Sequence, residues 1–456
     1  MSDFAANVLD VDSFWLFILG VVIFLVGLAV SIGLHEIGHL VPAKIFKVRV
    51  GQYMIGFGPK IFSKKVGETE YGLKLIPLGG YISMAGMFPP EKKAQQEAKK
   101  PSRLRKLFGR MVQDAHDASA ETMKGVDASR AFYHLPVWKR IIIMIGGPFM
   151  NLVLGFVLFA ILFMGIGQVQ ATTTVQTVAE CVVPVSSTAT ECSDEFPAGP
   201  ALAGGLLAGD RIVSINGEQV TQWSSGTEVI RASAGKPLTF VVDRDGVEKT
   251  LTITPVTNEI YATNADGTPV LDAAGKPTTV TVGYIGIGPA QGFVQQPITA
   301  VFPVMWQTVA GTANMIATLP QRVVDVGESA FTSAPRDPNG PVSVVGIGRV
   351  AGEIASTDQV PVESKVATIL GLLASLNIAL FIFNLVPLLP LDGGHIAGAI
   401  WEAIRRGVAK LRHKADPGPF DTAKLMPLTF VVVSLLIAMS ALFIYADIVK
   451  PISLFG

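Results

Sequence analysis

Four long apolar segments dominate the hydrophobic pattern of the chain. They cover residues 14–34, 141–169, 366–389 and 425–446. The first is an uncharged run of 21 residues, and a helix of that length, at about 1.5 Å per residue, crosses a hydrocarbon core of about 30 Å. The pattern therefore predicts a polytopic α-helical membrane protein with about four transmembrane helices.

Composition agrees with a membrane protein and excludes several soluble classes. Half of the residues are hydrophobic (50%) and only 16% are charged. The 36 Lys and Arg are matched by 36 Asp and Glu, whereas a nucleic-acid-binding protein needs an excess of basic residues to neutralise phosphates. Because the first 13 residues carry no Lys or Arg, the first apolar segment does not read as a cleavable signal peptide.

The charges are distributed unevenly between the loops. Residues 41–140 contain 19 Lys and Arg against 8 Asp and Glu, whereas residues 167–366 contain 10 basic and 19 acidic residues. The positive-inside rule therefore places residues 41–140 and the basic connection 390–424 in the cytoplasm. Both termini and residues 167–366 are expected outside.

The first apolar segment runs directly into the motif His35-Glu36-Ile37-Gly38-His39. Residues i and i+4 of a helix share a face, so both imidazoles can reach one metal ion while the carboxylate of Glu36 lies beside it. Ionisable residues are costly near a bilayer and mark functional sites. The motif therefore predicts a metal centre, and its ligands favour zinc over calcium or magnesium. The alternative is that the histidines are merely interfacial.

A catalytic zinc needs a third protein ligand, and Asp392 is the best candidate. By the topology above, the first and third segments run in the same direction, which brings His35, His39 and Asp392 to the same cytoplasmic depth. Pro387 and Pro390 break helical hydrogen bonding, which is tolerated at membrane depth only inside protein or around a wet cavity. The alternative is an ordinary proline-broken helix end.

The two cysteines, Cys181 and Cys192, both fall in the region predicted to be extracytoplasmic, where oxidation is permitted. We expect a disulfide between them, which would close a short loop and contribute about 3 kcal/mol of stability. Two unpaired thiols are the alternative.

These motifs resemble the site-2 protease family of intramembrane zinc metalloproteases, in its bacterial branch with a single PDZ domain. The likeness rests on HEIGH in the first segment, residues 147–151 (GPFMN) in the second and residues 384–395 (NLVPLLPLDGGH) in the third. It covers nearly the whole chain and weakens over residues 88–135 and 258–330. One departure is an extra residue between Pro387 and Pro390, which affects the expected path of the loop but not the ligand.

The resemblance implies a role for each matching residue. Those roles are catalysis for Glu36, zinc binding for His35, His39 and Asp392, and oxyanion or substrate binding for Asn384 and Asn151. Zinc lowers the pKa of a bound water to about 7, and Glu36 would take a proton from the attacking water and pass it to the leaving amine. The family further implies one Zn2+ per chain and a single-pass transmembrane substrate, such as an anti-sigma factor that another protease has already shortened.

Three further segments have predicted structures. Residues 51–82 read as a β-hairpin, similar to the family's membrane-associated β-loop, whose edge can hold an extended substrate by strand addition; an ordinary surface hairpin is the alternative. Residues 199–217 (GPALAGGLLAGDRIVSING) resemble the PDZ domains of this family, and we expect a size filter or sensor for shortened substrates. Residues 99–112 read either as an interfacial amphipathic helix or as a solvated basic loop.

The expected protein is a multi-pass protein of the bacterial plasma (inner) membrane that also carries a membrane-associated β-hairpin and an extracytoplasmic PDZ-like domain. Its predicted parts are a first transmembrane helix (1–40), a cytoplasmic basic region (41–137), a second helix (138–169), the PDZ-like domain (170–258), a β-rich extension and linker (259–365), a third helix with LDGG (366–395), a cytoplasmic loop (396–424) and a fourth helix (425–447).

A zinc transporter and an inactive membrane scaffold are the alternatives to a protease. Some zinc transporters also place histidines and a glutamate on a transmembrane helix, but four spans with a single ligand cluster and a large insert do not describe a permeation path. A catalytically inactive membrane scaffold could present the PDZ-like domain. The intact Glu36 argues against it, because a scaffold needs no base beside the metal.

Overall fold

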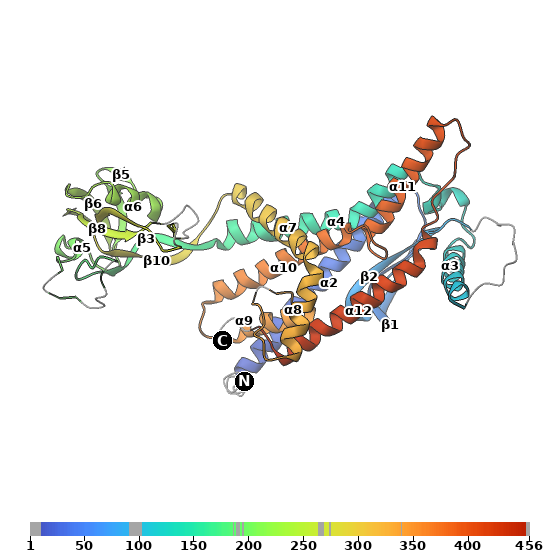
Figure 1. The fold of residues 1–456 in the computed structure, drawn as a ribbon, viewed down its shortest axis with the longest axis horizontal. Helices are drawn as coiled ribbons and strands as arrows, with labels where there is room; N and C mark the ends of the chain where they lie inside the picture. Colours follow the sequence, from blue (N-terminus) through green and yellow to red (C-terminus); the bar gives the residue numbers. More distant parts are fainter. Residues whose placement is uncertain are drawn as a thin grey trace. The chain divides into compact units, whose positions relative to one another are not determined.

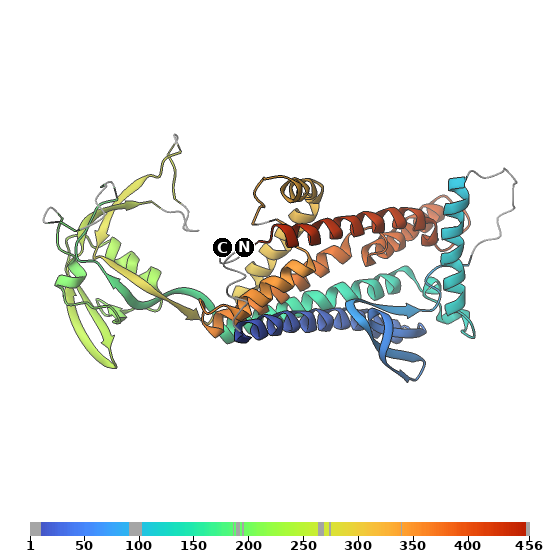
Figure 2. The same cartoon turned by 90° about the horizontal axis from the view of Figure 1, so that it is seen from below.

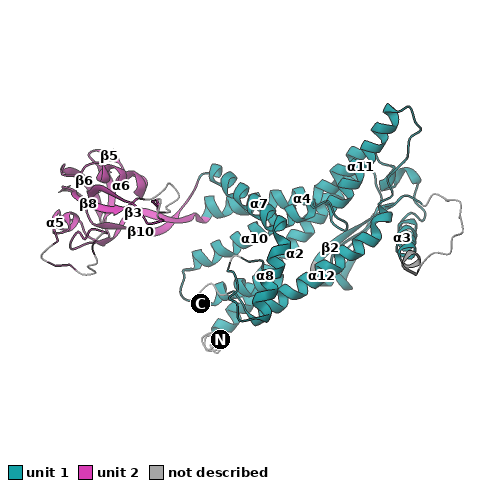
Figure 3. Ribbon diagram, in the orientation of Figure 1, with its two compact units in different colours: residues 1–165, 297–456 teal, residues 166–296 magenta. Residues whose placement is uncertain are grey.

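The computed structural model describes residues 11–90, 103–185, 187, 192–193, 196–262, 269–272, 275–338 and 340–452. The chain divides into two compact units (Figure 3). The helical unit comprises Met1–Gly165 and Pro297–Gly456, and the β-rich unit comprises Ile166–Gln296. Residues 99–102 of the segment read as an interfacial helix lie outside the described residues, whereas its remainder belongs to helix α3 (Arg103–Thr122).

Four helices of the helical unit are long and apolar enough to cross a membrane, and they run alongside one another (Figures 1 and 2). They are α2 (Val11–Ile45), α4 (Val137–Ala160), α10 (Val362–Leu385) and α12 (Met426–Val449). Two short turns extend them: η3 (Ile161–Ile166) follows α4, and η5 (Thr422–Leu425) precedes α12. The shortest candidate has 24 residues, about 36 Å at 1.5 Å per residue, which exceeds the hydrocarbon core. The prediction of four spans is confirmed on length and composition.

The first three spans form the core of the helical unit. Helix α2 packs along α4, and α4 packs along α10. A short helix, α9 (Val344–Ser356), packs along the N-terminal half of α2, where Gly20 leaves no room for a side chain beside the Ala351 carbonyl. Helix α12 is the least buried of the four spans and packs on α3, α8 (Leu319–Phe331) and α9.

Several helices form where the sequence analysis predicts a linker or a loop. They are η4 (Ile298–Ala300), α7 (Val301–Ala317), α8 and α9 within the predicted extension 259–365, and α11 (Asp392–Leu411) within the third span and the loop after it. The helices α7 to α9 have 13 to 17 residues, too few to cross a bilayer, so a search for spanning runs passes over them.

The third span also ends earlier than residue 395. Helix α10 stops at Leu385, and α11 begins at Asp392. The prolines Pro387 and Pro390 lie between the two helices, where a ring in place of the N–H group cannot continue the helical ladder. The LDGG motif therefore starts a new helix instead of ending the third span.

The hairpin predicted at residues 51–82 is present as β1 (Val50–Val66) and β2 (Thr69–Met84). Residues 52–55 pair on one side with residues 80–83 and on the other with residues 70–73, while residues 60–66 pair with residues 69–74. The two long strands therefore fold into a small sheet of four segments. Residues 76–84 form one of its edges.

One face of this sheet packs on α2. The Tyr53 hydroxyl donates a hydrogen bond to the Gly33 carbonyl (2.7 Å), in the helical turn that precedes Glu36. Burial raises the pKa of Tyr53 to about 12, so the hydroxyl remains a proton donor at physiological pH. Through this contact β1 is joined directly to the part of α2 that carries HEIGH.

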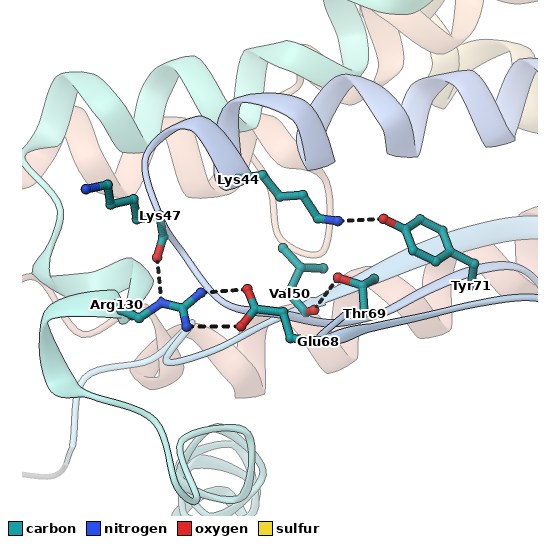
Figure 4. Close-up of polar contacts among 7 residues, drawn as sticks. All are labelled: Lys44, Lys47, Val50, Glu68, Thr69, Tyr71 and Arg130. Atoms are coloured by element: carbon teal, nitrogen blue, oxygen red, sulfur yellow. Dashed lines mark hydrogen bonds and ion pairs between the residues drawn. The ribbon is translucent and has the colours of Figure 1, made fainter. Parts of the chain in front are cut away.

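A polar cluster holds the turn between β1 and β2 at the end of α2 (Figure 4). Arg130, in the turn η1 (Ala128–Arg130), donates from its two Nη atoms to the Glu68 carboxylate (3.0 and 2.6 Å) and from Nε to the Lys47 carbonyl (3.1 Å). Lys44 Nζ donates to the Tyr71 hydroxyl (2.5 Å). These side chains are partly exposed, and such pairs contribute only about 0 to 1 kcal/mol. The cluster positions the hairpin more than it stabilises the fold.

The β-rich unit contains one larger and one smaller antiparallel sheet. The order of the first is β10-β3-β4-β6-β7, with β5 beside β4, and the second pairs β8 with β9. The strands are β3 (Gln168–Val178), β4 (Arg211–Ile215), β5 (Glu218–Gln219), β6 (Leu238–Arg244), β7 (Val247–Ile253), β8 (Val256–Tyr261), β9 (Thr279–Tyr284) and β10 (Ile287–Val294). Two helices, α5 (Pro200–Ala203) and α6 (Trp223–Arg231), complete the unit.

The β-rich unit has its own apolar core, one disulfide and a buried ion pair. Phe240 and Leu206 are fully buried at its centre. Cys181 and Cys192 form a disulfide, with Cα atoms 5.8 Å apart. The buried Asp210 accepts hydrogen bonds from Arg244 (2.6 and 2.7 Å), which lowers the pKa of its carboxyl below the usual range. This pair links β6 to the Leu206–Asp210 turn that precedes β4.

Candidate metal site and active site

Helix α2 positions the two histidines of HEIGH side by side. The helix continues unbroken through the motif to Ile45, so His35 and His39 are one turn apart on the same face. Their Nε2 atoms lie 3.1 Å apart. Both side chains are largely buried, as expected for residues that face neighbouring helices instead of lipid.

Asp392 completes a cluster of three ligand atoms. It is the first residue of α11, and its Oδ2 lies 3.3 Å from Nε2 of His35 and 3.3 Å from Nε2 of His39. The membrane topology inferred from the loop charges predicts these three residues at one depth. The structure brings them together into a group that can hold a metal ion.

The spacing and the chemistry of the cluster fit zinc. A tetrahedral zinc with ligands at 2.0 to 2.1 Å holds them about 3.3 to 3.4 Å apart, close to the 3.1 to 3.3 Å found between these atoms. Asp392 Oδ2 is buried and accepts no conventional hydrogen bond within the described residues. An oxygen and two nitrogen lone pairs that converge in a buried site repel one another, and a bound cation removes that repulsion.

The other ring nitrogen of each histidine is held by a neighbour on α4. His39 Nδ1 lies 2.7 Å from the Ile143 carbonyl, which can only accept, so Nδ1 carries the proton and Nε2 keeps its lone pair. His35 Nδ1 lies 3.1 Å from the amide nitrogen of Asn151, and the amide oxygen of Asn151 has no partner within the described residues. With the amide turned so that its oxygen faces the ring, Asn151 would fix the same tautomer for His35.

Glycines let α2 and α4 approach at this level. A side chain at Gly38 would collide with the Gly146 carbonyl, and one at Gly146 would collide with the Gly38 carbonyl. Small residues of this kind permit close packing of helices in membranes. A Cβ at Gly147 would collide with His39 Nε2 and lie 2.7 Å from His35 Nε2. Gly147 therefore leaves the room that the metal and its ligands need.

Glu36 lies between the metal cluster and the hairpin. Its side chain is buried, with 8% of the residue exposed. A Cβ at Gly80 of β2 would lie 3.0 Å from Glu36 Cγ and 2.9 Å from Ile32 Cγ2. The edge segment of the hairpin thus passes directly beside the predicted base.

The segment between α10 and α11 contains the remaining predicted residue. Asn384 lies in the last turn of α10, is partly exposed and makes no side-chain hydrogen bond with the residues that the structure describes. Its role in binding substrate or the oxyanion stays a prediction. Gly393 and Gly394 are needed for the tight turn, because a Cβ at Gly394 would lie 2.5 Å from the Leu389 nitrogen.

Neither Gly80 nor His395 is predicted from the sequence to be a site residue. His395 follows Asp392 by three residues, and its ring centroid lies 6.4 Å from that of Phe88, four residues after the end of β2. Burial lowers the pKa of His395 to about 4, so its ring is neutral at physiological pH. The glycine pairs at residues 79–80 and 146–147 are the sequence features that indicate these close contacts, because glycine allows another chain segment to approach the backbone closely.

Gly147→Ala should remove the metal without unfolding the helical bundle. The added Cβ occupies the space beside His39 Nε2, so we expect the zinc content of the purified protein to fall by at least about tenfold. Gly165→Ala is the matched control on the same helical run, because a Cβ there meets nothing within 4 Å. Elemental analysis of both variants decides the matter, and stoichiometric zinc in Gly147→Ala would contradict the assigned site.

Comparisons with known proteins identify the family of the chain. Residues 23–415 match the model of peptidase family M50. The chain is 32% identical over 450 residues to "Zinc metalloprotease Rip1" of Mycobacterium tuberculosis, covering 96% of this chain and 100% of that protein. It is 33% identical over 453 residues to the protein of the same name in Mycolicibacterium smegmatis, with the same coverage, and 27% identical over 429 residues to "Zinc metalloprotease RasP" of Geobacillus kaustophilus, covering 84% and 90%. The chain therefore belongs to peptidase family M50, the site-2 proteases, and is a membrane zinc metalloprotease.

Proposed function

We propose that the protein cuts single-pass transmembrane proteins, such as anti-sigma factors already shortened by another protease, at a site inside the helical bundle. One observation carries the proposal. The buried carboxylate of Glu36 adjoins three ligand atoms, from His35, His39 and Asp392, that converge between apolar helices. A substrate that reaches such a site must itself enter the membrane.

The reaction needs a base, an acid and a stabilised oxyanion. Zinc, held by His35, His39 and Asp392, would supply Lewis acidity and lower the pKa of the attacking water. Glu36 takes a proton from that water and returns it to the leaving amine. In this proposal Asn384, whose side chain makes no hydrogen bond to another described residue, would donate to the developing oxyanion.

Glu36→Gln tests this mechanism. The amide cannot accept the proton, so we expect cleavage of a reconstituted single-pass substrate to fall by about 10²- to 10⁴-fold while zinc stays bound. Asp392→Ala is the companion variant and should lose zinc as well as activity. Undiminished cleavage by Glu36→Gln would exclude Glu36 as the base, and cleavage by neither wild type nor variant would favour a transporter or an inactive scaffold.

We also propose that the edge of the hairpin holds the substrate in an extended form. A transmembrane helix buries its carbonyls in hydrogen bonds and must unwind before a protease can attack it. Residues 76–84 are an edge segment, and Gly80 lies beside Glu36. A substrate strand that pairs with this edge would bring its peptide carbonyls past the base.

The opposite face of the hairpin carries a row of hydrogen-bonded polar side chains. Tyr81 donates to Gln52 (3.1 Å), Gln52 donates to Glu70 (3.1 Å), and Lys74 donates to Tyr81 (3.0 Å). Polar groups in a row of this kind are stable near the membrane only where water or protein surrounds them. We infer that water wets this face of the hairpin, and hydrolysis consumes a water molecule.

Tyr53→Phe should weaken substrate holding without disturbing the metal. The change removes the hydrogen bond from β1 to the Gly33 carbonyl and leaves the ring in place. One lost hydrogen bond of about 1 kcal/mol predicts a several-fold rise in KM for a transmembrane substrate, with unchanged zinc content. Tyr445→Phe on α12 is the control, and equal KM values in wild type and Tyr53→Phe would contradict the role of this contact.

The β-rich unit is proposed to be a PDZ-like filter on the extracytoplasmic side, while the zinc site lies toward the cytoplasmic side. The loop charges give this orientation, with the acidic insert and both termini outside and the basic loops inside. A disulfide in the β-rich unit agrees with an oxidising compartment. PDZ domains bind extended segments or chain ends, which suits the recognition of a newly made terminus.

Excision of the β-rich unit tests the filter. Gln168 of β3 pairs with Val294 of β10, so the ends of the unit lie together and a short Gly-Ser linker can replace residues 169–293. We expect the shortened enzyme to cut full-length and pre-shortened substrates alike, whereas the intact enzyme cuts only the latter. A shortened enzyme that still refuses the full-length substrate but cuts the pre-shortened one would show that the unit is not the filter.

A further inference from the structure

A hydrogen bond between two buried polar side chains joins α2 to α10, inside the apolar bundle. Asn377 on α10 is fully buried (0% exposed) and Ser31 on α2 is almost so (2%). Asn377 Nδ2 donates to Ser31 Oγ (2.9 Å) and to the Leu373 carbonyl (2.8 Å), and Ser31 Oγ donates to the Gly27 carbonyl (2.9 Å). No other side-chain hydrogen bond joins residues 11–45 to residues 362–385.

Burying this polar pair costs free energy that an apolar pair of the same shape would not. A buried amide is unfavourable unless its groups are bonded, and Asn377 Oδ1 has no partner within the described residues. Apolar residues of similar shape would be nearly neutral or better for stability. A buried polar pair that contributes little to folding stability can still select one arrangement of the helices over others.

The arrangement that matters here is the register of α2 against α10. These two helices carry the metal ligands, because His35 and His39 lie on α2 and Asp392 follows the end of α10. Ser31 precedes His35 by four residues and so lies on the same face of α2, one turn away. The neighbouring contact is apolar: the Leu373 side chain packs over Gly27 and forms no directed bond there.

A slip of one residue would shift one helix by about 1.5 Å along the other. Metal–ligand distances tolerate only about 0.2 Å of error. A directed hydrogen bond one turn from the ligands is the kind of contact that can exclude such a slip, since lipid offers no hydrophobic driving force to fix the register.

We propose that Asn377 and Ser31 are positioning residues that hold α2 and α10 in the register required to bind zinc. The inference rests on the proposed zinc site. It assigns neither residue to the chemistry, because neither touches the cluster. It makes the affinity for zinc, and the geometry of its ligands, depend on an interhelical contact one turn deeper in the bundle.

The test uses the full-length protein in detergent, with Ser31→Ala and Asn377→Leu. We expect each to weaken zinc binding by about tenfold in competition with a chelator, and to alter the visible absorption of the Co2+-substituted protein, which reports tetrahedral geometry. Because the two residues act as a pair, the double variant should bind zinc no more weakly than Asn377→Leu. Ser31→Thr keeps the hydroxyl and should resemble wild type.

Thr368→Val is the matched control. Its hydroxyl donates only within α10, to the Ser364 carbonyl (2.7 Å), so zinc binding should not change. A purely structural role for Asn377 would lower the unfolding temperature of the metal-free protein and leave zinc affinity and the Co2+ spectrum as they were. That result in both Ser31→Ala and Asn377→Leu would overturn the proposal, and Ser31→Ala alone decides it if Asn377→Leu does not fold. A wild-type protein without zinc affinity would contradict the proposed function instead.

Discussion

The close approach of α2 and α4 is the constraint on which the site depends. Gly38 and Gly146 bring the two backbones together, and Gly147 opens the space into which both imidazoles point. The approach also places the Ile143 carbonyl and the Asn151 amide behind the rings, where the carbonyl leaves His39 Nε2 free for a metal and the amide contacts His35 Nδ1. Helices held further apart by larger residues would lose the metal pocket and its supporting contacts together.

The membrane makes these supporting contacts necessary. Lone pairs in a low-dielectric site repel strongly, and unbonded N–H groups are costly, so each polar group near the cluster needs a defined partner. His39 has the Ile143 carbonyl, His35 has Asn151, and the three inward-facing atoms are left for a cation. The site is thus arranged so that the bound metal satisfies the last unpaired groups.

Some of this arrangement is readable from the sequence. The spacing of His35 and His39 follows from the helical period alone, and Asp392 follows from counting spans and comparing their directions. The prolines after Asn384 indicate the helix break, although the predicted third span extends to residue 395. The elements that the sequence predicts are those marked by a helical spacing of residues or by a helix-breaking proline nearby.

The features that the sequence does not predict depend on contacts between residues far apart in the chain. Nothing near Ser31 indicates that Asn377, 346 positions away in the chain, is its partner. The role of Gly147 becomes visible only when α4 lies against α2. The helices α7 to α9 carry apolar residues in runs too short to count as spans, and their place beside α2, α10 and α12 is set by packing in three dimensions.

The buried arginines of the helical unit are paired with carboxylates away from the metal site. Arg140, near the start of α4, pairs with Glu402 of α11 (2.6 Å), and Arg336 pairs with Asp447 near the end of α12 (2.5 Å). Both pairs lie near the ends of spans, where two desolvated charges can neutralise each other and bond nearby backbone groups. In the described parts of the spans, Glu36 is therefore exceptional: it is a buried carboxylate with no cationic Lys or Arg beside it. A carboxylate placed in that way is suited to exchange a proton, whereas one locked to an arginine is not.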